Sequence, residues 1–586
     1  MFLTDPIGSM ERSIIPMRLP PAMSDRVTAS APRRASGRSA TLVGAGVLLS
    51  RLSGLIRETV LAGLLGTKLA ADAFKAALQI PGLLQNVLGE GVLSASFVPV
   101  YADLIEREDG DDDASHAESA DAMAGTIATI LGLITAVLVF VGIVAARPLT
   151  RVVLPFLADD TFDLTVRLVR IMWAGLGFIV LSAWCLGVLN THRRFFLSYV
   201  APVLWNAAQV VLAIVAWTRG WNDADIARAA AWGVALGGLL QFLVQLPTVR
   251  KVAPRIRPVL RLHMTSVRDV GRRFGPAVLG RGVIQLSAFL DLFLAGLLAA
   301  GAITGLSFAQ ILYLLPIGIF AMSVAAADLP ELAREQHSAP RVAARMRTGH
   351  ERITFYVLFS AIAFITMGKP IVRALFQRGE FNADDTVFVW LVLAAYSLGL
   401  VGSAASRLFQ NACFAAGDVS GPARLAGLRV VIAAAIGLTL MFQFERYGVI
   451  DGEIHKLGDL PAFGLLPESV RQDDLGAQRI GAVGLALGSA VASWVEYALL
   501  RRRVRNSLTT TRRYRDPAIS LLPAGIVAAA TGALLAWGLD GVTPLLVAPL
   551  SIGVAGSLYV GIAYWRGSPS AADLLQTTRG LRGSGS

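Results

Sequence analysis

The sequence is short of charge, lysine and cysteine, and each shortage excludes a class of protein. Only 16% of its 586 residues are charged, against about 25% in an average soluble domain, and the mean hydropathy is +0.60. These values argue against a soluble multidomain enzyme. The two cysteines, Cys185 and Cys413, lie in apolar runs, so neither a disulfide framework nor a CxxC metal site is expected.

Motifs for nucleotide-driven or hydrolytic chemistry are also missing. The sequence has no GxxxxGK[ST] phosphate loop, no dinucleotide-binding fingerprint between a strand and a helix, and no HExxH pair. We therefore expect a chain that is not an enzyme and holds no cofactor, catalytic residue or metal.

Long apolar runs are what the sequence has in abundance. Fourteen runs are candidates to cross a hydrocarbon core of roughly 30 Å as helices of about 20 residues, and of these the run 353–367 is short. They are residues 40–65, 73–101, 122–146, 168–189, 199–217, 229–249, 276–300, 306–329, 353–367, 387–416, 425–442, 480–500, 519–539 and 542–565. The predicted fold is an all-α polytopic membrane protein.

The placement of the cations predicts orientation. Lys and Arg number 53 against 41 acidic residues, a net charge of +12 that in a soluble chain would suggest nucleic acid. With the N-terminus in the cytoplasm, 33 of the 53 cations fall on cytoplasmic segments, as the positive-inside rule requires. We therefore expect a multi-pass membrane protein with both termini cytoplasmic and no nucleic-acid partner.

An internal repeat divides the spans into two lobes. The sequence Leu-Ala-Gly-Leu-Leu occurs at 61–65 and again at 294–298, each time three residues after a carboxylate, Glu58 or Asp291. The copies are six spans apart and so cross the membrane in the same direction, which indicates a parallel repeat of two six-helix lobes with two helices appended. The predicted organisation is a disordered basic arm (1–39), an N-lobe (40–249), a basic cytoplasmic linker (250–275), a C-lobe (276–500) with an outer loop (443–479), a basic loop (501–518), two final spans (519–565) and a cytoplasmic tail (566–586).

The first span carries charge at membrane depth. Arg51, Arg57 and Glu58 lie near its middle, where one charge costs about 2.5 to 3.5 kcal/mol and normally faces a bundle interior or a wet cavity. At 100° per residue, Arg51 and Glu58 share a face and Arg57 points elsewhere. Two interpretations stay open: a structural Arg–Glu pair, or arginine contact with a substrate.

The second span carries a polar stripe. Asp72, Gln79, Asn86 and Glu90 lie within about 40° of one line on a helix and extend over about 27 Å, which predicts one wall of a solvated cavity. A buried polar seam between helices is the alternative.

Fewer charges lie in the second lobe. Asp291 is the lone carboxylate in the middle of its span, Gln310 and Arg407 lie in later spans, and Arg429 is near enough to a span end to snorkel to the surface. Asp291 could bind a coupling cation or exchange a proton; a structural pairing fits equally well.

The sequence resembles the MviN/MurJ family of lipid II flippases, in the multidrug, oligosaccharidyl-lipid and polysaccharide exporter superfamily. The resemblance covers about residues 40–500. It is densest at 50–58 running on to 72–74, at 90–99, at 189–195 with 201–206, at 233–247, at 395–400 and at 417–418.

The resemblance implies two lobes around a cationic cavity that takes an undecaprenyl-pyrophosphate-linked muropeptide, lipid II, with a tail groove beside the two final helices. It gives Arg51, Arg57, Asp72 and Glu90 functional weight. Its further implications are roles in peptidoglycan biosynthesis, cell-wall biogenesis and cell shape, with membrane lipids and cell-wall synthesis proteins as partners. Guanidinium groups suit a pyrophosphate because they bind its oxygens bidentately and stay charged in a low dielectric.

The chain departs from the family pattern at three positions. Gln85 and Asn86 replace an arginine pair, and Gln310 replaces an arginine of the eighth span, so the expected cavity is less cationic. Some relatives bind sodium between spans seven and eleven; here Asp291, and less directly Glu58, are the candidates for ion coupling, and span eleven has no carboxylate or asparagine. Coupling through H⁺, Na⁺ or the membrane potential therefore stays open.

Lipid II transport by alternating access is the leading hypothesis. Export of another lipid-linked oligosaccharide or a small amphiphile by the same architecture is the nearest alternative. An enzyme acting on lipid-linked sugars through Asp72 and Glu90 belongs to a different class, and a scaffold for cell-wall synthesis is compatible with transport.

Overall fold

The computed structural model describes residues 37–108, 119–322, 324, 331, 334, 338–457, 463–473, 476–507, 516–539 and 541–583. The predicted basic arm at 1–39 lies outside the described residues except for its last three positions. Within the described ranges the chain is almost entirely helical.

The described residues of the first half of the chain form ten helices. They are α1 (Gly37–Leu65), α2 (Leu69–Leu88), α3 (Glu90–Glu108), α4 (Ala120–Val144), α5 (Ala146–Val153), α6 (Asp159–Thr191), α7 (Phe195–Val200), α8 (Pro202–Thr218), α9 (Asp223–Val252) and α10 (Thr265–Ala295). Helices α9 and α10 extend into both ends of the predicted linker at 250–275.

The second half adds the remaining helices and a small sheet. They are α11 (Ala302–Pro316), the π-helix η2 (Ile317–Ala321), α13 (Ala339–Thr366), α14 (Gly368–Phe376), α15 (Ala383–Leu398), α16 (Leu400–Ala415), α17 (Ser420–Phe444), β1 (Tyr447–Ile450), β2 (Glu453–Lys456), α18 (Glu468–Arg471), β3 (Gln478–Arg479), α19 (Gly481–Ser507), α20 (Pro517–Gly538), α21 (Pro544–Trp565) and α22 (Pro569–Gly583).

The helices confirm a polytopic all-α membrane protein. Among the described residues, ten helices are long and apolar enough to cross a membrane, or up to twelve if each of two bent pairs counts as one span: α13 with α14, bent by 79°, and α15 with α16, bent by 43°. The two other predicted spans correspond to α1 and α10, which are 29 and 31 residues long. Both helices carry charged residues at membrane depth, which a purely apolar span would lack.

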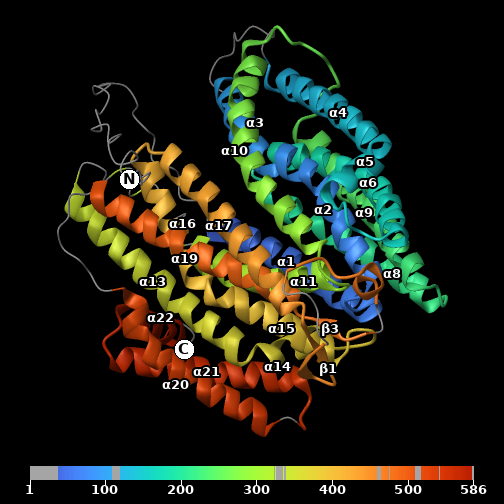
Figure 1. Cartoon of the computed structure of the whole chain (residues 1–586). Helices are drawn as coiled ribbons and strands as arrows, with labels where there is room; N and C mark the ends of the chain where they lie inside the picture. The colour runs from blue at the N-terminus through green and yellow to red at the C-terminus, as the bar shows by residue number, and fades with distance from the viewer. Residues whose placement is uncertain are drawn as a thin grey trace, which may run out of the picture.

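The helices form two groups that meet at one end (Figure 1). Helices α2, α6, α8 and α9 pack together in the first group, and α13, α15, α16, α17 and α19 in the second, with α20 and α21 against α13 and α14. The groups converge where β1 and β3 lie and diverge toward the other end. We call these the sheet end and the far end.

Glycines bring the N-lobe helices into close contact. A Cβ at Gly238 of α9 would lie 2.2 Å from the carbonyl oxygen of Gly175 in α6, and one at Gly233 would lie 2.4 Å from the Cα of Gln209 in α8. Small residues at such crossings let backbones approach where lipid supplies no hydrophobic drive. This packing explains the glycine-rich sequence of α9.

The predicted outer loop at 443–479 folds on the sheet end. Its three short strands pair antiparallel in the order β2-β1-β3, and its Arg471 reaches the first lobe, where Nη1 donates to the carbonyl oxygen of Phe156 over 2.7 Å. The loop is therefore a contact between the lobes as well as an exposed insertion.

Candidate functional site

A buried cluster of three charges joins α1 to α2. Arg57 Nη2 lies 2.5 Å from Glu58 Oε1, and Lys75 Nζ pairs with the other oxygen of the same carboxylate. The side chains of Glu58 and Lys75 are 5% and 8% exposed, so the cluster is shielded from solvent. Glu58 therefore balances one of the two cations and leaves a positive surplus.

The predicted proximity of Arg51 and Glu58 on one helix face does not become a pair. Glu58 faces Lys75 of α2, and the long side chain of Arg57 bends toward Glu58 because its other side is held: Nη1 donates to Asn206 Oδ1 over 3.0 Å and the guanidinium lies 4.8 Å from the ring centroid of Trp205. Helical spacing within α1 cannot predict these contacts with residues of α8. Arg57 is thus fixed by protein groups.

Arg51 lies at the boundary between the lobes. It is exposed and forms no hydrogen bond or ion pair with a described residue. A Cβ placed on Gly318 of η2 would be 3.1 Å from Arg51 Nη1, so the guanidinium crosses from α1 to the second lobe. The missing side chain at Gly318 provides the space that it occupies.

A cavity of about 460 Å³ in the first lobe collects four of the predicted site residues: Arg51, Arg57, Gln85 and Glu90. Sequence reasoning missed Tyr199, Asn206 and Gln241, which also line it. Asn206 and Gln241 lie in stretches that carry the family resemblance, which were the only signal for them, whereas Tyr199 falls between two such stretches.

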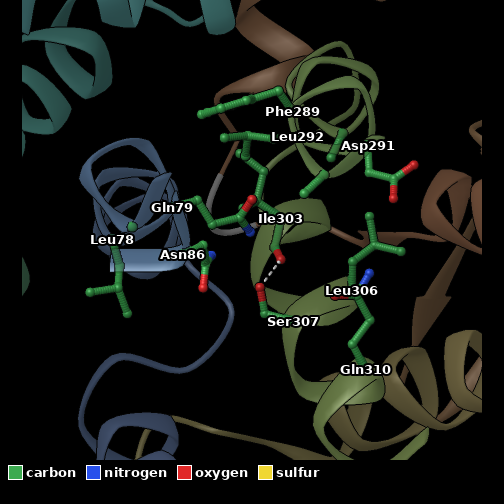
Figure 2. Close-up of a pocket in the computed structure, with 13 residues that line it drawn as sticks. Leu78, Gln79, Asn86, Phe289, Asp291, Leu292, Ile303, Leu306, Ser307 and Gln310 are labelled. Carbon is green, nitrogen blue, oxygen red and sulfur yellow. Dashed lines mark hydrogen bonds between the residues drawn. The ribbon is translucent and has the colours of Figure 1, made fainter. Parts of the chain in front are cut away.

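A second cavity, of about 280 Å³, lies between the lobes (Figure 2). Gln79 and Asn86 come to it from α2, and Ser307 and Gln310 from α11. Gln310 Nε2 also donates to the hydroxyl oxygen of Tyr396 over 3.1 Å. The wall therefore offers amide and hydroxyl groups rather than cations.

Asp291 lines the same cavity from α10, with its carboxylate turned away from Gln79 and Asn86 in Figure 2. It has no hydrogen bond or ion pair with any residue that the structure describes, and Arg429 is the one cation acting on it. Across the described ranges, no group of three or more His, Cys, Asp and Glu residues could hold a metal ion.

The predicted stripe on the second span does not form one wall. The helix continues past Pro81 but ends at Leu88, and the extended backbone of Gly89 separates it from α3. Gln79 and Asn86 consequently face the interlobe cavity, whereas Glu90 lines the N-lobe cavity. A single helical wheel over 72–90 could not show this break.

Asp72, the remaining residue of the stripe, ties the lobes together at the sheet end. Its Oδ1 accepts from the backbone N–H and the hydroxyl of Thr304, over 2.7 and 2.6 Å, and its Oδ2 accepts from the N–H of Gly301 over 2.8 Å. The carboxylate of the first lobe thus caps the N-terminus of α11 in the second, where an anion is favoured.

Side chains from the turn after α1 reinforce this closure. Lys68 Nζ lies 3.2 Å from Asp223 and 2.7 Å from Glu380, which belong to different lobes. Burial alone would lower the pKa of Lys68, but its bonds to Glu380 and Asp223 raise it above the ordinary value. Thr67 donates to Asp385 and accepts from Gln478 Nε2 over 2.7 Å. The sheet end is therefore closed by polar contacts.

The second lobe buries a charge cluster of its own. Glu496 of α19 is 1% exposed and lies 2.9 Å from Arg429 Nη1, and it accepts from Gln410 Nε2 over 2.9 Å. The prediction that Arg429 snorkels to the surface is wrong, because a buried carboxylate on the neighbouring helix holds it. Arg407 lines neither cavity and lies near this cluster.

Comparison with known proteins gives one consistent match. The model of the family described as lipid II flippase MurJ matches residues 61–450. A probable lipid II flippase MurJ of Rhizobium meliloti is 32% identical over 421 residues, which are 70% of this chain and 76% of the relative. One from Vibrio cholerae is 28% identical over 542 residues, covering 90% and 94%.

Solved structures agree on the fold. A lipid II flippase MurJ in an inward closed conformation superposes with a TM-score of 0.66 at 20% identity, over 89% of this chain and 100% of that one. An inward-facing multidrug resistance transporter of the MATE family gives 0.59 at 16% identity, over 81% and 100%. The two-lobed architecture is thus shared with both.

Proposed function

The chain belongs to the lipid II flippase MurJ family, and on that premise we propose that it carries lipid II from the inner to the outer leaflet of the bacterial cytoplasmic membrane by alternating access. Unaltered lipid is the product, so the chain acts as a transporter and not as an enzyme.

The cationic N-lobe cavity is the observation that carries the proposal. Arg51 faces it with no partner among the described residues, and the buried cluster beside it holds two cations against Glu58. A pyrophosphate is a multivalent anion whose oxygens match the guanidinium fork. Arg51 is the group that binds it directly, while Arg57, fixed by Asn206 and Glu58, supplies positive potential from a set position.

The interlobe cavity suits the uncharged part of the head. Gln79, Asn86, Ser307 and Gln310 present donors and acceptors to hydroxyl and amide groups. The glutamine and asparagine that replace family arginines here therefore shift recognition from charge to hydrogen bonding. In this arrangement only the first lobe binds the pyrophosphate.

The two lobes are in contact at the sheet end and diverge toward the far end, and this arrangement defines the state of the transporter. With the far end in the cytoplasm, as the basic segments there favour, this arrangement admits substrate from the inner leaflet. Breaking the contacts of Asp72, Lys68 and Thr67 would open the outer side. The sheet at 447–479 then lies on the outer surface.

Resetting requires a driving force, and Asp291 is the candidate for coupling. A carboxylate without a cationic partner at membrane depth can take up H⁺ or Na⁺ as the lobes rearrange. Net charge moved across the membrane is worth about 2.3 kcal/mol per elementary charge per 100 mV, so the membrane potential can also drive the return without ATP.

A leaflet-accessibility assay tests the function. Cells whose own flippase is depleted are supplied with this chain, and a membrane-impermeant reagent added outside labels the lipid II that it reaches. We expect labelling to rise with the chain and to collapse without it. Unchanged labelling would refute the proposal.

The variant Arg51→Ala tests the proposed pyrophosphate contact in the same assay. We expect outer-leaflet lipid II to fall about tenfold or more, because a lost charge-assisted bond to a buried anion costs about 1.5 to 3 kcal/mol. Abundance and membrane insertion should not change, since Arg51 is exposed. Arg170→Ala, an exposed arginine of α6 outside both cavities, is the matched control, and equal loss in the two variants would remove Arg51 from the binding site.

Export of another lipid-linked oligosaccharide is the second candidate. The neutral side chains at Gln85, Asn86 and Gln310 favour it, because amide groups suit the hydroxyl groups of an oligosaccharide better than the carboxylates of a peptide. Supplying O-antigen-type lipid oligosaccharide in the same assay distinguishes the two: transport of that lipid, with no transport of lipid II, would establish the alternative.

A further inference from the structure

The loop between α17 and α19 is fixed at its base to the second lobe. It leaves α17 at Phe444 and enters α19 at Gly481, and these two helices pack along each other. Its strands β1 and β3 pack against α15 of the same lobe. We call the described residues of this loop, 445–457, 463–473 and 476–480, the strap.

Backbone groups hold the strap to the second lobe. The N–H of Gly452, in the turn between β1 and β2, donates to Asp384 Oδ1 at the start of α15 over 2.6 Å. The carbonyl oxygen of Arg471 accepts from the N–H of Ala300, in the turn between α10 and α11, over 2.9 Å. Because a backbone group moves only with its own segment, the strap and the second lobe form one body.

Side chains of the strap reach the first lobe. Arg471 Nη1 donates to the carbonyl oxygen of Phe156, between α5 and α6, over 2.7 Å. Gln478 Nε2 donates to Thr67 Oγ1, in the turn after α1, over 2.7 Å. A side chain can leave such an acceptor by changing rotamer while its backbone stays in place. Arg471 therefore rests on one lobe through its backbone and reaches the other through its guanidinium.

The bond to Thr67 couples the strap to the direct contacts between the lobes. The same hydroxyl group accepts from Gln478 and donates to Asp385 of the second lobe. Hydrogen bonds that share a hydroxyl group polarise and strengthen each other, so loss of the bond from Gln478 also weakens the bond to Asp385. Arg471 and Gln478 lie outside residues 61–450, the segment that the family model matches, and that match assigns them no role.

We propose that the strap moves with the second lobe and holds the first lobe through Arg471 and Gln478, so that release of these two side chains limits how often the outer side opens. This role rests on the proposed alternating access, in which the sheet end has to open. The loop is then a regulatory element of transport, because any change that displaces Arg471 or Gln478 favours the outward-open state.

Distance measurements by double electron–electron resonance, on the full chain in lipid nanodiscs, test the strap. One spin-label pair joins the strap to the first lobe, at Glu453→Cys and Arg219→Cys. The other pair joins it to the second lobe, at Glu453→Cys and Lys369→Cys. These three positions are exposed, and the buried native Cys185 and Cys413 are replaced by alanine.

The double variant R471Q/Q478A should release the strap from the first lobe. We expect a longer distance to appear for the first pair, while the distances of the second pair stay as in the unmodified chain. The ratio of released to held forms should rise about tenfold for R471Q alone and about fivefold for Q478A alone, because a charged donor contributes more than an amide. Unchanged distances in the double variant, or a longer distance for the second pair, would overturn the proposal.

Two control variants separate the bonds from general loosening. Gln472→Ala removes an amide whose bond to Glu468, over 2.8 Å, stays within the strap, and it should change neither distance. Arg471→Lys keeps a cationic donor and should keep most of the held form at an unchanged melting temperature. A shift in Gln472→Ala equal to that in Q478A, or a released strap in Arg471→Lys despite normal melting, would also overturn the proposal.

Reversible cross-linking connects the strap to transport. In Phe156→Cys/Arg471→Cys a reducible bifunctional thiol reagent joins the strap to the first lobe, and we expect outer-leaflet lipid II labelling to fall at least tenfold and to return on reduction. In Ala300→Cys/Arg471→Cys the reagent joins the strap to its own lobe and should not change labelling. Loss in both pairs, or in neither pair despite complete cross-linking, would overturn the proposal. If the chain without reagent moves no lipid II, the proposed function fails, and the distance measurements alone decide whether the strap holds the first lobe.

Discussion

The two copies of the Leu-Ala-Gly-Leu-Leu repeat place a carboxylate one turn before the same sequence and then use it differently. Glu58 is enclosed by Arg57 and Lys75, whereas Asp291 borders the interlobe cavity and has no paired cation among the described residues. Equivalent scaffold positions thus give a positive site in one lobe and a negative one in the other. Because the two lobes carry opposite charges at equivalent positions of the repeat, one lobe can hold an anionic substrate and the other a cation.

The turns after the two copies also differ. Thr67 and Lys68 in the first turn bond through side chains to Asp385 and Glu380. In the second turn, backbone N–H groups at 299–301 donate to Glu445, to the carbonyl oxygen of Arg471 and to Asp72. Closure of the sheet end therefore depends on side-chain donors in the first turn and on backbone donors in the second.

Removing Glu58 should have the largest effect. Glu58→Ala leaves the buried ammonium of Lys75 and the guanidinium of Arg57 without a counter-charge, which costs about 3 to 5 kcal/mol of folding free energy. We expect a much lower melting temperature and loss of complementation. Differential scanning fluorimetry in detergent, together with growth of flippase-depleted cells, measures both.

Glu58→Gln/Lys75→Met is the matched control, because it removes the acid and one cation together. It should recover most of the stability, with Arg51 and Arg57 still in place. A double variant as unstable as Glu58→Ala would mean that shape, and not charge balance, makes Glu58 necessary.

Asp72→Ala should have the next largest effect. The variant leaves three donors of the α11 N-terminus unpaired in a buried place, each costing about 1 to 3 kcal/mol unless water reaches it. We expect the sheet end to open more often, detected as faster labelling by a thiol reagent of a cysteine introduced at the buried Ala302 at the start of α11. The corresponding variant of an exposed acid, Asp159→Ala, should leave the labelling rate unchanged; identical rates in all forms would exclude a closing role for Asp72.

Sequence reasoning predicted the spans and the repeat because hydrophobic length and identical residues need no knowledge of neighbours. It located Arg51, Arg57 and Glu90 at one cavity for a similar reason: charge at membrane depth is rare. It erred where contacts between helices decide, at the break after Leu88 and at the Arg429–Glu496 pair. Arg429 and Glu496 are 67 positions apart, and helical periodicity cannot predict a contact over that separation.

Asp291→Asn should alter transport more than stability. A carboxylate with no paired cation gains little from its surroundings, so we expect a change in folding free energy of at most about 1 kcal/mol. If Asp291 takes up the coupling ion, the variant should lose the dependence of lipid II labelling on the ion gradient that the unmodified chain shows. Retained dependence would assign coupling elsewhere or to the membrane potential.

Glu445→Gln should give the smallest change and one that depends on pH. Burial raises the pKa of Glu445 from an ordinary 4.5 to about 7, despite its bonds to the N–H groups of Ala299 and Gly481. A raised pKa means that the folded state binds the proton more tightly, so its stabilising contribution is complete below about pH 4.5 and is lost as the pH rises to about 7. We expect the melting temperature of the unmodified chain to fall by a few degrees more than that of the variant between pH 5 and pH 8. Glu453→Gln, on the exposed strand β2 at the same end, should keep the full pH dependence, and equal slopes in all three chains would show that Glu445 does not titrate in this range.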